Sequence, residues 1–378
     1  MRIVSVVGTR PQLIKAAALQ PALRRAYDEV FVDTGQHWDD AMAGAFFREL
    51  GLARPDHALG AGGGGHAEQT AAMLRGLEPI LLRERPDAVL VYGDTNSTLS
   101  GSLAAAKLGI PVAHVEAGLR SFDRRMPEEL NRIVADHVST WLFAPTATAV
   151  ANLAAEGLRD GVTLVGDLMQ DLAARTLPHI REAAVLDGIE RELQAAGTAV
   201  HLESGGYVFA TVHRQANREP GAIDRWAAVL GALAHRDRPV VLALHPGTRA
   251  ALQASGTVLG RDVVVIEPQS YRTSLALQLH AAAVVTDSGG VQREAAWLGV
   301  PCLVLRTTTE WPEVVDGRAA ALIGLDAAAA RAALTERVPL AESAELARQR
   351  AASASLDPAG AADAIVLALS RPVGVGGS

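Results

Sequence analysis

Short apolar runs alternate with longer, helix-length segments along almost the whole chain. This alternation is typical of βα units, in which each buried strand of a parallel sheet is followed by a helix that covers the sheet. In the first part of the chain, the pattern predicts strands near Ile3–Val7, Val30–Asp33, Ala88–Val91, Val112–Val115, Trp141–Ala144 and Val162–Val165. In the second part, it predicts strands near Val208–Thr211, Val240–Leu244, Val263–Ile266, Ala283–Thr286, Cys302–Leu305 and Ala320–Ile323. The sequence therefore predicts an α/β fold.

A change in the pattern separates the two series of strands. After Gly166 the chain becomes more polar and irregular, and the second series begins near Gly205 and Gly206. A chain of 378 residues is also longer than one ordinary hydrophobic core supports. We expect two Rossmann-like, doubly wound domains that face a deep cleft, with ligands held at the carboxyl ends of the strands.

Composition narrows the class of protein. Hydrophobic residues make up 49% of the chain but aromatic residues only 4%, so the core must consist mainly of Ala, Val and Leu. The net charge of -7 argues against nucleic acid as a partner. An anionic ligand would have to be held by local cations and backbone amides.

Several other classes are excluded by what the sequence lacks. Cys302 is the only cysteine, which rules out an intrachain disulfide and a zinc site built on cysteines. No His and carboxylate residues have a metal-ligand spacing such as HExxH, so we expect no metal. The first apolar run is too short for a signal peptide, and no segment has the length of a membrane span. We therefore expect a cytoplasmic protein without a membrane partner.

Three carboxylates lie close together in sequence, between Tyr92 and Arg132. Asp94 and Glu116 each follow a predicted strand, and Glu129 lies at the start of the next helical segment. A carboxylate just beyond an apolar strand points toward the edge at which parallel sheets bind ligands. One such residue is weak evidence, but three favour a site that transfers protons.

The turn after the first strand has the residues of an anion site. Gly8 permits a tight turn, and Pro11 suits the start of a helix whose free amides would lie beside Arg10 and Lys15. A plain turn with two solvated cations is an equally good interpretation of this segment alone.

A second turn of this kind follows the strand at Ala283–Thr286. Ser288 can cap the next helix, while Gly289 and Gly290 let backbone amides approach a phosphate. Glu294, about one turn further on, can accept both hydroxyls of a ribose, and a surface carboxylate near a helix start is the alternative. Together the two turns suggest a diphosphate ligand.

Histidines at strand ends are candidates for the same site. His213 follows the strand at Val208–Thr211, so we expect it to face the ligand-binding edge. His245 lies in a Pro-Gly turn and His37 follows the second strand, and a structural role suits both equally well. The glycine run at 62–65 is expected to be a loop, because no strand leads into it and no Lys-Ser/Thr follows.

The chain resembles the non-hydrolysing UDP-N-acetylglucosamine 2-epimerases. The segments that carry the resemblance occur in the family's order: GTRPQLIK (8–15), TGQH (34–37), GDTNST (93–98), HVEAGLRS (114–121), PEELNR (127–132), TVHR (211–214), TDSGGVQRE (286–294) and TTEWPE (308–313). The resemblance implies the fold of the two-domain nucleotide-sugar glycosyltransferases, a homodimer, and a C-terminal helix at Asp357–Leu369 that returns to the first domain. The domains would then comprise residues 1–166 with 357–370, and residues 167–356.

The resemblance also implies a site and a reaction. The residues that match the family's acid/base and essential positions are Asp94, Glu116, Glu129 and His213. The residues that match its UDP-sugar contacts are Arg10, Lys15, Gln269, Ser288, Gly289, Gly290 and Glu294. The implied reaction is the reversible inversion of C2 in UDP-N-acetylglucosamine, with no cofactor.

Inversion at C2 cannot begin with deprotonation, because the C2 hydrogen is not next to a carbonyl carbon. If UDP leaves C1, the C2 proton becomes acidic enough for a carboxylate to remove, and a 2-acetamidoglucal forms. Protonation of the other face of C2, with return of UDP, gives the manno epimer. This scheme needs acid/base groups on two faces and a clamp on the diphosphate. We expect Asp94 and Glu116 to exchange the C2 proton from opposite faces and Glu129 to support them. We expect His213 to stabilise the charge on the departing phosphate.

Several positions depart from the family. Trp38–Asp40 replaces a basic, amide-containing stretch, and Ala72 stands where an arginine serves a second, regulatory UDP-sugar, so we expect no activation by substrate. Ser274 replaces a phenylalanine near the nucleotide. Arg293 replaces a glutamate, and Trp311 is typical of the branch that includes epimerases of modified sugars. UDP-2,3-diacetamido-glucuronate is therefore an alternative substrate.

Three other functions share parts of this pattern. A glycosyltransferase of the same fold would share the Ser-Gly-Gly turn and Glu294, but it does not need carboxylates at Asp94, Glu116 and Glu129. A hydrolysing relative would differ only in whether water reaches the glucal intermediate. A nucleotide-sugar sensor is disfavoured because the acid/base set is intact.

Overall fold

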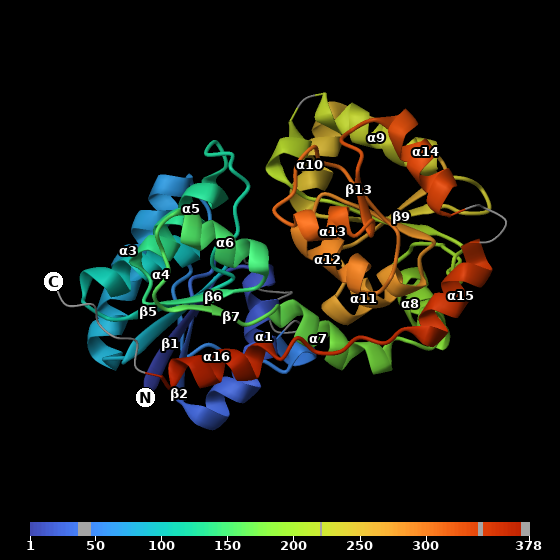
Figure 1. Ribbon diagram of the computed structural model, residues 1–378. Coiled ribbons are helices and arrows are strands. Elements are labelled where there is room, and N and C mark those ends of the chain that lie inside the picture. The colour runs from blue at the N-terminus through green and yellow to red at the C-terminus, as the bar shows by residue number, and fades with distance from the viewer. Residues whose placement is uncertain (37–46, 220, 339–342, 372–378) are drawn as a thin grey trace. The chain divides into compact units, whose positions relative to one another are not determined.

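The structure is a computed structural model that describes residues 1–36, 47–219, 221–338 and 343–371. The chain divides into two compact units, each built on its own β-sheet (Figure 1). Unit 1 comprises Met1–Leu172 and Asp357–Ser378, and unit 2 comprises Ala173–Leu356.

Within the described residues, unit 1 contains a seven-stranded sheet of parallel strands in the order β3-β2-β1-β4-β5-β6-β7. The strands are β1 (Arg2–Val7), β2 (Asp28–Asp33), β3 (His57–Ala58), β4 (Ala88–Tyr92), β5 (Val112–Val115), β6 (Trp141–Ala144) and β7 (Val162–Leu164). The strands β2 and β3 lie on one side of β1, and the strands β4 to β7 follow on its other side. The strand order therefore reverses between β1 and β4.

Unit 2 contains, in its described part, a six-stranded parallel sheet in the order β10-β9-β8-β11-β12-β13. The strands are β8 (Val208–Val212), β9 (Val240–Leu244), β10 (Val263–Ile266), β11 (Ala283–Thr286), β12 (Cys302–Val304) and β13 (Ala320–Leu322). Here the order reverses between β8 and β11.

Helices connect the strands and cover the sheets. In unit 1 they are α1 (Arg10–Ala26), α3 (His66–Glu84), α4 (Asn96–Lys107), α5 (Pro127–Val138), α6 (Ala147–Ala155) and α16 (Ala361–Leu369). The helix α7 (Leu168–Thr176) leads from unit 1 into unit 2. The helices of unit 2 are α8 (Ala184–Ala195), α9 (Ala222–Leu233), α10 (Pro246–Ser255), α11 (Tyr271–His280), α12 (Gly289–Trp297), α13 (Pro312–Asp316), α14 (Ala327–Arg337) and α15 (Ser343–Ser353).

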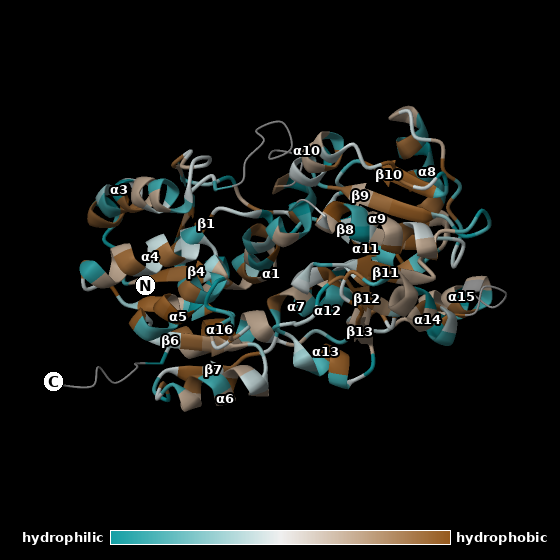
Figure 2. Ribbon diagram, turned by 90° about the horizontal axis from the view of Figure 1, so that it is seen from above, coloured by the Kyte–Doolittle hydropathy of each residue, from teal (hydrophilic) through white to brown (hydrophobic). Residues whose placement is uncertain are grey.

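Every strand that the hydrophobic pattern predicts is present, and the two-domain α/β prediction is confirmed. The strands are easily recognised because helices cover both faces of a parallel sheet, so its strands are continuous apolar runs. In β4, for example, all residues are buried. Figure 2 shows the hydrophobic residues concentrated on the strands, with hydrophilic residues on the outer sides of the helices. The pattern missed β3, because two residues are too few to form an apolar run.

The C-terminal helix α16 packs against α1 in unit 1 (Figure 1). Tyr27, which follows α1, donates a hydrogen bond from its hydroxyl to the carbonyl of Val366, at 2.9 Å. The helix begins at Ala361, later than the Asp357 that the resemblance implies. Pro358 and Gly360 explain the later start, since Gly360 has a φ of +73° and cannot belong to the helix.

Candidate active site

The carboxyl ends of β1 and β4 form the point at which the strand order of unit 1 reverses. Doubly wound sheets bind ligands at such a switch point, where the connections on either side lead away from each other. The strand β4 leads to Gly93 and Asp94, and the adjacent β5 leads to Glu116. The fold therefore brings two of the three predicted carboxylates to the expected ligand-binding edge.

Asp94 has the most exposed side chain of the three carboxylates, at 32%. Its carboxylate pairs with the guanidinium of Arg132 on α5. Its backbone carbonyl accepts a hydrogen bond from Asn131 Nδ2, at 3.0 Å. Asn131 and Arg132 thus orient Asp94, a role that sequence analysis did not assign, although both lie in the PEELNR segment.

Glu116 has a strained backbone and a buried cationic partner. Its φ of +73° lies in the left-handed region, where a residue other than glycine costs about 1–3 kcal/mol. Lys15 Nζ lies 2.5 Å from Glu116 Oε2, and both side chains are nearly buried. Gly93 makes room for this pair, since a Cβ atom there would lie 3.3 Å from both Lys15 Nζ and Glu116 Oε2. Lys15 therefore pairs with a carboxylate, in addition to the UDP-sugar contact that the resemblance implies for it.

Glu129 is buried, in contrast to Asp94, and its oxygens are used to hold a loop. Only 1% of its side chain is exposed. It accepts hydrogen bonds from the amide and hydroxyl of Ser121, from the amide of Phe122 and from Arg132, each at 2.9 Å. Glu129 therefore anchors the loop between β5 and α5 and shares Arg132 with Asp94.

The start of α1 differs from the expected anion site. The side-chain oxygen of Gln12 accepts hydrogen bonds from the amides of Gly8 and Thr9, at 2.8 and 3.1 Å. Pro11, the second residue of the helix, has no N–H group to offer. The amides of Gly8 and Thr9, which directly precede the helix, are therefore already used, and the expectation of free amides at this turn is corrected for these two.

In unit 2 the switch point lies between β8 and β11, and it brings His213 and Asp287 together. Asp287 is fully buried and accepts hydrogen bonds from the amides of His213 and Arg214, at 3.1 and 2.9 Å, and from Asn217 Nδ2, at 2.8 Å. His213 Nδ1 lies 3.6 Å from Asp287 Oδ1, while 40% of the His213 side chain is exposed. Asp287 thus orients His213, and sequence analysis missed this role although Asp287 directly follows a predicted strand.

The start of α12 has the geometry expected of an anion-binding turn. Ser288 caps the helix by accepting a hydrogen bond from the amide of Val291, at 3.4 Å. The first residues of the helix are Gly289 and Gly290. A Cβ atom at Gly289 would lie 3.2 Å from Trp311 Nε1, so a glycine at this position leaves room for the Trp311 ring beside the start of the helix. The amides at a helix start attract anions because they are free and carry the positive end of the helix dipole.

Glu294 and Gln269 are held by neighbouring groups of unit 2. Glu294 is buried, and its Oε2 accepts a hydrogen bond from Gln278 Nε2 on α11, at 2.7 Å. Gln269 precedes α11 and donates to the carbonyl of Glu267, at 2.7 Å. Gln278 was not predicted, because its partner lies on a different helix.

Arg293 and Trp311, which sequence analysis singled out as departures, contact each other. The guanidinium carbon of Arg293 lies 3.7 Å from the ring centre of Trp311, which is a cation–π contact.

The other positions that sequence analysis singled out as departures lie elsewhere. Ser274 on α11 and Ala72 on α3 are both partly buried. Residues 37–40, which include His37 and the Trp-Asp-Asp segment, lie outside the described residues.

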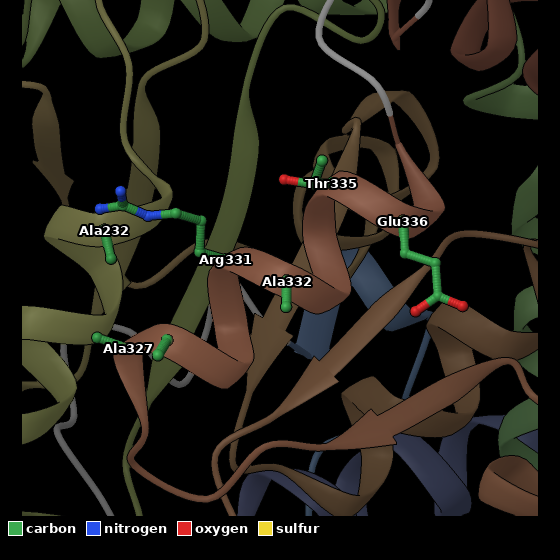
Figure 3. Close-up of a pocket in the computed structure, with 7 residues that line it drawn as sticks. Ala232, Ala327, Arg331, Ala332, Thr335 and Glu336 are labelled. Atoms are coloured by element: carbon green, nitrogen blue, oxygen red, sulfur yellow. The ribbon is translucent and has the colours of Figure 1, made fainter.

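Surface hollows occur away from these residues as well as beside them. A hollow of about 740 Å³ in unit 2 is lined by the helices α9 and α14, mostly by alanines, with Arg331 and Glu336 (Figure 3). A second hollow, of about 480 Å³, lies along α5 in unit 1, where Phe122 and Glu129 are among the residues that line it. Small apolar side chains offer a ligand little to recognise, so the α9–α14 hollow does not change the location of the candidate site.

The described part of the chain lacks two further kinds of feature. No group of three or more His, Cys, Asp or Glu residues in it could hold a metal ion. None of its helices combines the length and the apolar character that a membrane crossing requires.

Comparison with known proteins identifies the family. The family model of UDP-N-acetylglucosamine 2-epimerase matches residues 21–369. The UDP-2,3-diacetamido-2,3-dideoxy-D-glucuronate 2-epimerase of Pseudomonas aeruginosa is 42% identical over 86% of this chain and 88% of its own length. The UDP-N-acetylglucosamine 2-epimerase of Methanococcus maripaludis is 38% identical over 86% of this chain and 88% of its own length.

Solved structures lead to the same family. The crystal structure of the UDP-GlcNAc 2-epimerase of Methanocaldococcus jannaschii, in complex with UDP-GlcNAc and UDP, matches with a TM-score of 0.85 and 34% identity, over 98% of this chain and 99% of the other. The glycosyltransferase SnogD of Streptomyces nogalater shares the fold alone, with a TM-score of 0.51 and 19% identity. The matched site segments, the fold and these relatives together show that the chain is an isomerase and belongs to the UDP-N-acetylglucosamine 2-epimerase family.

Proposed function

We propose that the protein interconverts UDP-N-acetylglucosamine and UDP-N-acetylmannosamine by inversion at C2. The observation that carries this proposal is the pairing at the unit 1 switch point, where Asp94 and Glu116 each contact a separate cation, Arg132 and Lys15. Two carboxylates with separate partners suit a reaction that moves one proton between two faces of a carbon atom. A glycosyltransferase needs no such pair.

The proposed reaction begins with loss of UDP from C1. The C1–O bond breaks, its electrons leave with UDP, and positive charge develops on C1 and the ring oxygen. A carboxylate then removes the C2 proton, and the C–H electrons form the C1–C2 double bond of a 2-acetamidoglucal. The second carboxylic acid delivers a proton to the opposite face of C2, and the UDP oxygen bonds again to C1. No net gain or loss of atoms or electrons occurs, so no cofactor is required.

Within this scheme, Asp94 and Glu116 exchange the C2 proton from opposite faces. Glu129 supports them by anchoring the β5–α5 loop and by sharing Arg132 with Asp94. His213, oriented by Asp287, stabilises the negative charge on the departing phosphate.

We assign binding of the nucleotide part of the substrate to the turn at the start of α12. We assign the diphosphate to Ser288 and to the amides of Gly289 and Gly290, and the ribose hydroxyls to Glu294. Arg10, Lys15 and Gln269 are assigned further contacts with the UDP-sugar. Loss of UDP from the site would stop the cycle, so tight retention of UDP is part of the mechanism.

A second candidate substrate is UDP-2,3-diacetamido-glucuronate. The relative that acts on the 2,3-diacetamido-2,3-dideoxy sugar is 42% identical to this chain, compared with 38% for the M. maripaludis UDP-N-acetylglucosamine enzyme. The contact between Arg293 and Trp311 provides a further reason, since these are the two positions on which sequence analysis based the alternative substrate.

Assembly, regulation and location complete the proposal. We infer a homodimer in the cytoplasm, without activation by a second UDP-sugar, since Ala72 has no group that could bind one. Light scattering of the purified protein tests the dimer. Hyperbolic velocity curves in the UDP-sugar test the absence of activation, and a sigmoidal curve would contradict it.

The reaction is tested by incubating the protein with each UDP-sugar in deuterated water and following the products by NMR. We expect deuterium at C2 of a UDP-linked product, and the sugar that turns over fastest identifies the substrate. Free sugar with UDP would instead indicate hydrolysis. If neither UDP-N-acetylglucosamine nor UDP-2,3-diacetamido-glucuronate takes up deuterium at C2, epimerisation is rejected and a transferase or a sensor is favoured.

The assignment of the proton carriers is tested by Asp94→Asn and Glu116→Gln. Both replacements keep the size of the side chain but remove the proton-accepting group, so turnover should fall by at least a thousandfold, on the scale of a lost general base. UDP affinity, measured by calorimetric titration, should stay within about threefold. Glu128→Gln, an exposed carboxylate on α5, is the matched control and should retain activity. Near-wild-type epimerisation by either site variant would remove that residue from the mechanism.

A further inference from the structure

A buried pair of ionisable side chains lies next to the segments that carry Asp94 and Glu116, and the proposed mechanism does not use it. His114 on β5 and Asp136 on α5 are both fully buried. His114 Nδ1 lies 2.7 Å from Asp136 Oδ1, and His114 Nε2 lies 2.7 Å from the carbonyl oxygen of Gly93. Both ring nitrogens therefore have a partner at hydrogen-bond distance.

The two partners of His114 are both hydrogen-bond acceptors. A backbone carbonyl can only accept a hydrogen bond, and an ionised carboxylate can only accept as well. Burial tends to raise the pKa of Asp136, but the adjacent His114 and Arg120 hold this pKa below its usual value. Arg120 Nη1 lies 2.7 Å from Asp136 Oδ2, which keeps the carboxylate ionised. Each ring nitrogen of His114 therefore faces a hydrogen-bond acceptor, the Asp136 carboxylate or the Gly93 carbonyl.

The first consequence concerns Asp94. Gly93 directly precedes Asp94 and has a left-handed φ of +64°. The hydrogen bond from His114 to the Gly93 carbonyl fixes the peptide that leads into Asp94. The direction in which the Asp94 side chain leaves the backbone thus depends on His114.

The second consequence concerns Glu116, whose left-handed backbone requires support from both sides. Asp136 Oδ1 contacts His114, two residues before Glu116, and Asp136 Oδ2 accepts a hydrogen bond from the amide of Gly118, two residues after it, at 3.1 Å. A Cβ atom at Gly118 would lie 2.3 Å from the Ala149 carbonyl, so this segment is closely packed as well. One carboxylate therefore holds both flanks of the strained residue.

We propose that His114 and Asp136 form a positioning clamp that sets the geometry of Asp94 and Glu116 together. The proposal rests on the proposed function, and both clamp residues act through the backbone without touching the substrate. A small displacement of a proton-transferring group slows the chemical step far more than it weakens binding. Loss of the clamp should therefore lower kcat and leave KM and UDP affinity almost unchanged.

The clamp is tested by a pair of variants that break its hydrogen bonds and then restore them without charge. In His114→Gln, the amide can donate to only one of the two acceptors, and its oxygen faces the Asp136 carboxylate. We expect kcat to fall by at least about tenfold, with KM within about twofold. In the double variant His114→Gln/Asp136→Asn, the asparagine amide donates to the glutamine oxygen, and the glutamine amide donates to the Gly93 carbonyl. We expect kcat to return to within about threefold of wild type, because every bond has a partner again.

Two further variants are controls. In Asp136→Asn alone, the asparagine amide can donate to His114 Nδ1 while His114 Nε2 donates to the Gly93 carbonyl, so every bond keeps a partner and kcat should change by less than about threefold. His201→Gln removes an exposed histidine of unit 2 and should leave kcat unchanged.

The outcomes separate the clamp from the proposed function. Wild-type protein that epimerises no UDP-sugar rejects the function itself. If wild type is active and His114→Gln keeps its kcat, or if the double variant is no better than His114→Gln, the clamp is rejected and the function stands. A His114→Gln protein that is unfolded, or that loses UDP affinity along with kcat, assigns the pair a purely structural role and also overturns the proposal.

Discussion

The residue Gly93 shows how closely backbone conformation and acid/base chemistry depend on each other in this protein. Its φ of +64° is readily accessible only to glycine. Its missing side chain leaves the space next to Lys15 and Glu116, which a Cβ atom would approach to 3.3 Å. The left-handed backbone and the missing side chain are both needed at the residue before Asp94. A substitution of Gly93 therefore affects both proposed proton carriers, Asp94 and Glu116.

Gly93→Ala is expected to lower stability and kcat together. The left-handed backbone costs alanine about 1–2 kcal/mol, and the added methyl group displaces the Lys15–Glu116 pair, so kcat should fall by at least tenfold. The matched control is Gly157→Ala, since Gly157 has a φ of +85° but no atom within 4 Å of the added Cβ. It should show a similar loss of stability in thermal unfolding with normal kcat. Equal kcat values in the two variants would contradict this account of Gly93.

At the scale of single elements, helix ends are held by side chains from distant parts of the chain. The amides at the start of α16 are bound by Asp171 on α7, which accepts from Gly360 at 2.9 Å and from Ala362 at 3.0 Å. Gly360 itself has no side chain with which to cap the helix. The return of α16 to unit 1 therefore depends on a carboxylate that lies half the chain length away in sequence.

Asp171→Ala is expected to destabilise unit 1 by about 1–2 kcal/mol, because two helix-terminal amides lose their acceptor. Thermal unfolding measures this effect. Asp363→Ala is the control, because Asp363 is an exposed acid in the first turn of the same helix and contributes only through the helix dipole, at most about 0.5 kcal/mol. A control that costs as much as Asp171→Ala would show that charge, and not capping, holds α16.

At the scale of the whole molecule, the two units should respond to acid in different pH ranges. In unit 2, burial is the main cause that lowers the pKa of His280, whose ring contacts Ser204 Oγ and the carbonyl of Ile180. In unit 1, His114 and Arg120 hold the pKa of Asp136 below its usual value against the opposing effect of burial.

The sign of each effect follows from which state binds more protons. Below a pH of about 6.5, unfolded His280 takes up a proton that the folded form resists, so the stability of unit 2 falls as the pH decreases. Asp136 contributes stability above its unfolded pKa of about 3.9, and this contribution is lost only as the pH falls further, through the lower folded pKa. Unit 2 should therefore lose stability first.

Calorimetric unfolding between pH 7.5 and pH 5 measures this difference. We expect the transition of unit 2 to move to lower temperature while that of unit 1 changes less. His280→Gln can keep both hydrogen bonds without titrating, so it should flatten the pH dependence of unit 2, whereas His235→Gln, at an exposed position, should not. An unchanged slope in His280→Gln would mean that another group is responsible.

Much of the candidate site could be located from local sequence, but its internal contacts could not. Asp94, Glu116, His213 and Ser288 were recognised because each follows an apolar strand, and strands of a covered parallel sheet are apolar throughout. Arg132 escaped notice, because its pairing with Asp94 depends on where α5 packs. The free amides predicted at the start of α1 were partly wrong, because Gln12 turns back onto its own helix end.

The sequence by itself determined the strands, the α/β class, the division into two domains and the segments that mark the family, because these depend on apolar runs and on residues close together in the chain. The tertiary structure alone decided the strand order, and with it the two switch points at Asp94 and at His213. It also decided the contacts between Lys15 and Glu116 and between His114, Asp136 and Gly93. Such contacts join residues from different elements, and their distances are set by packing, which no local stretch of sequence encodes.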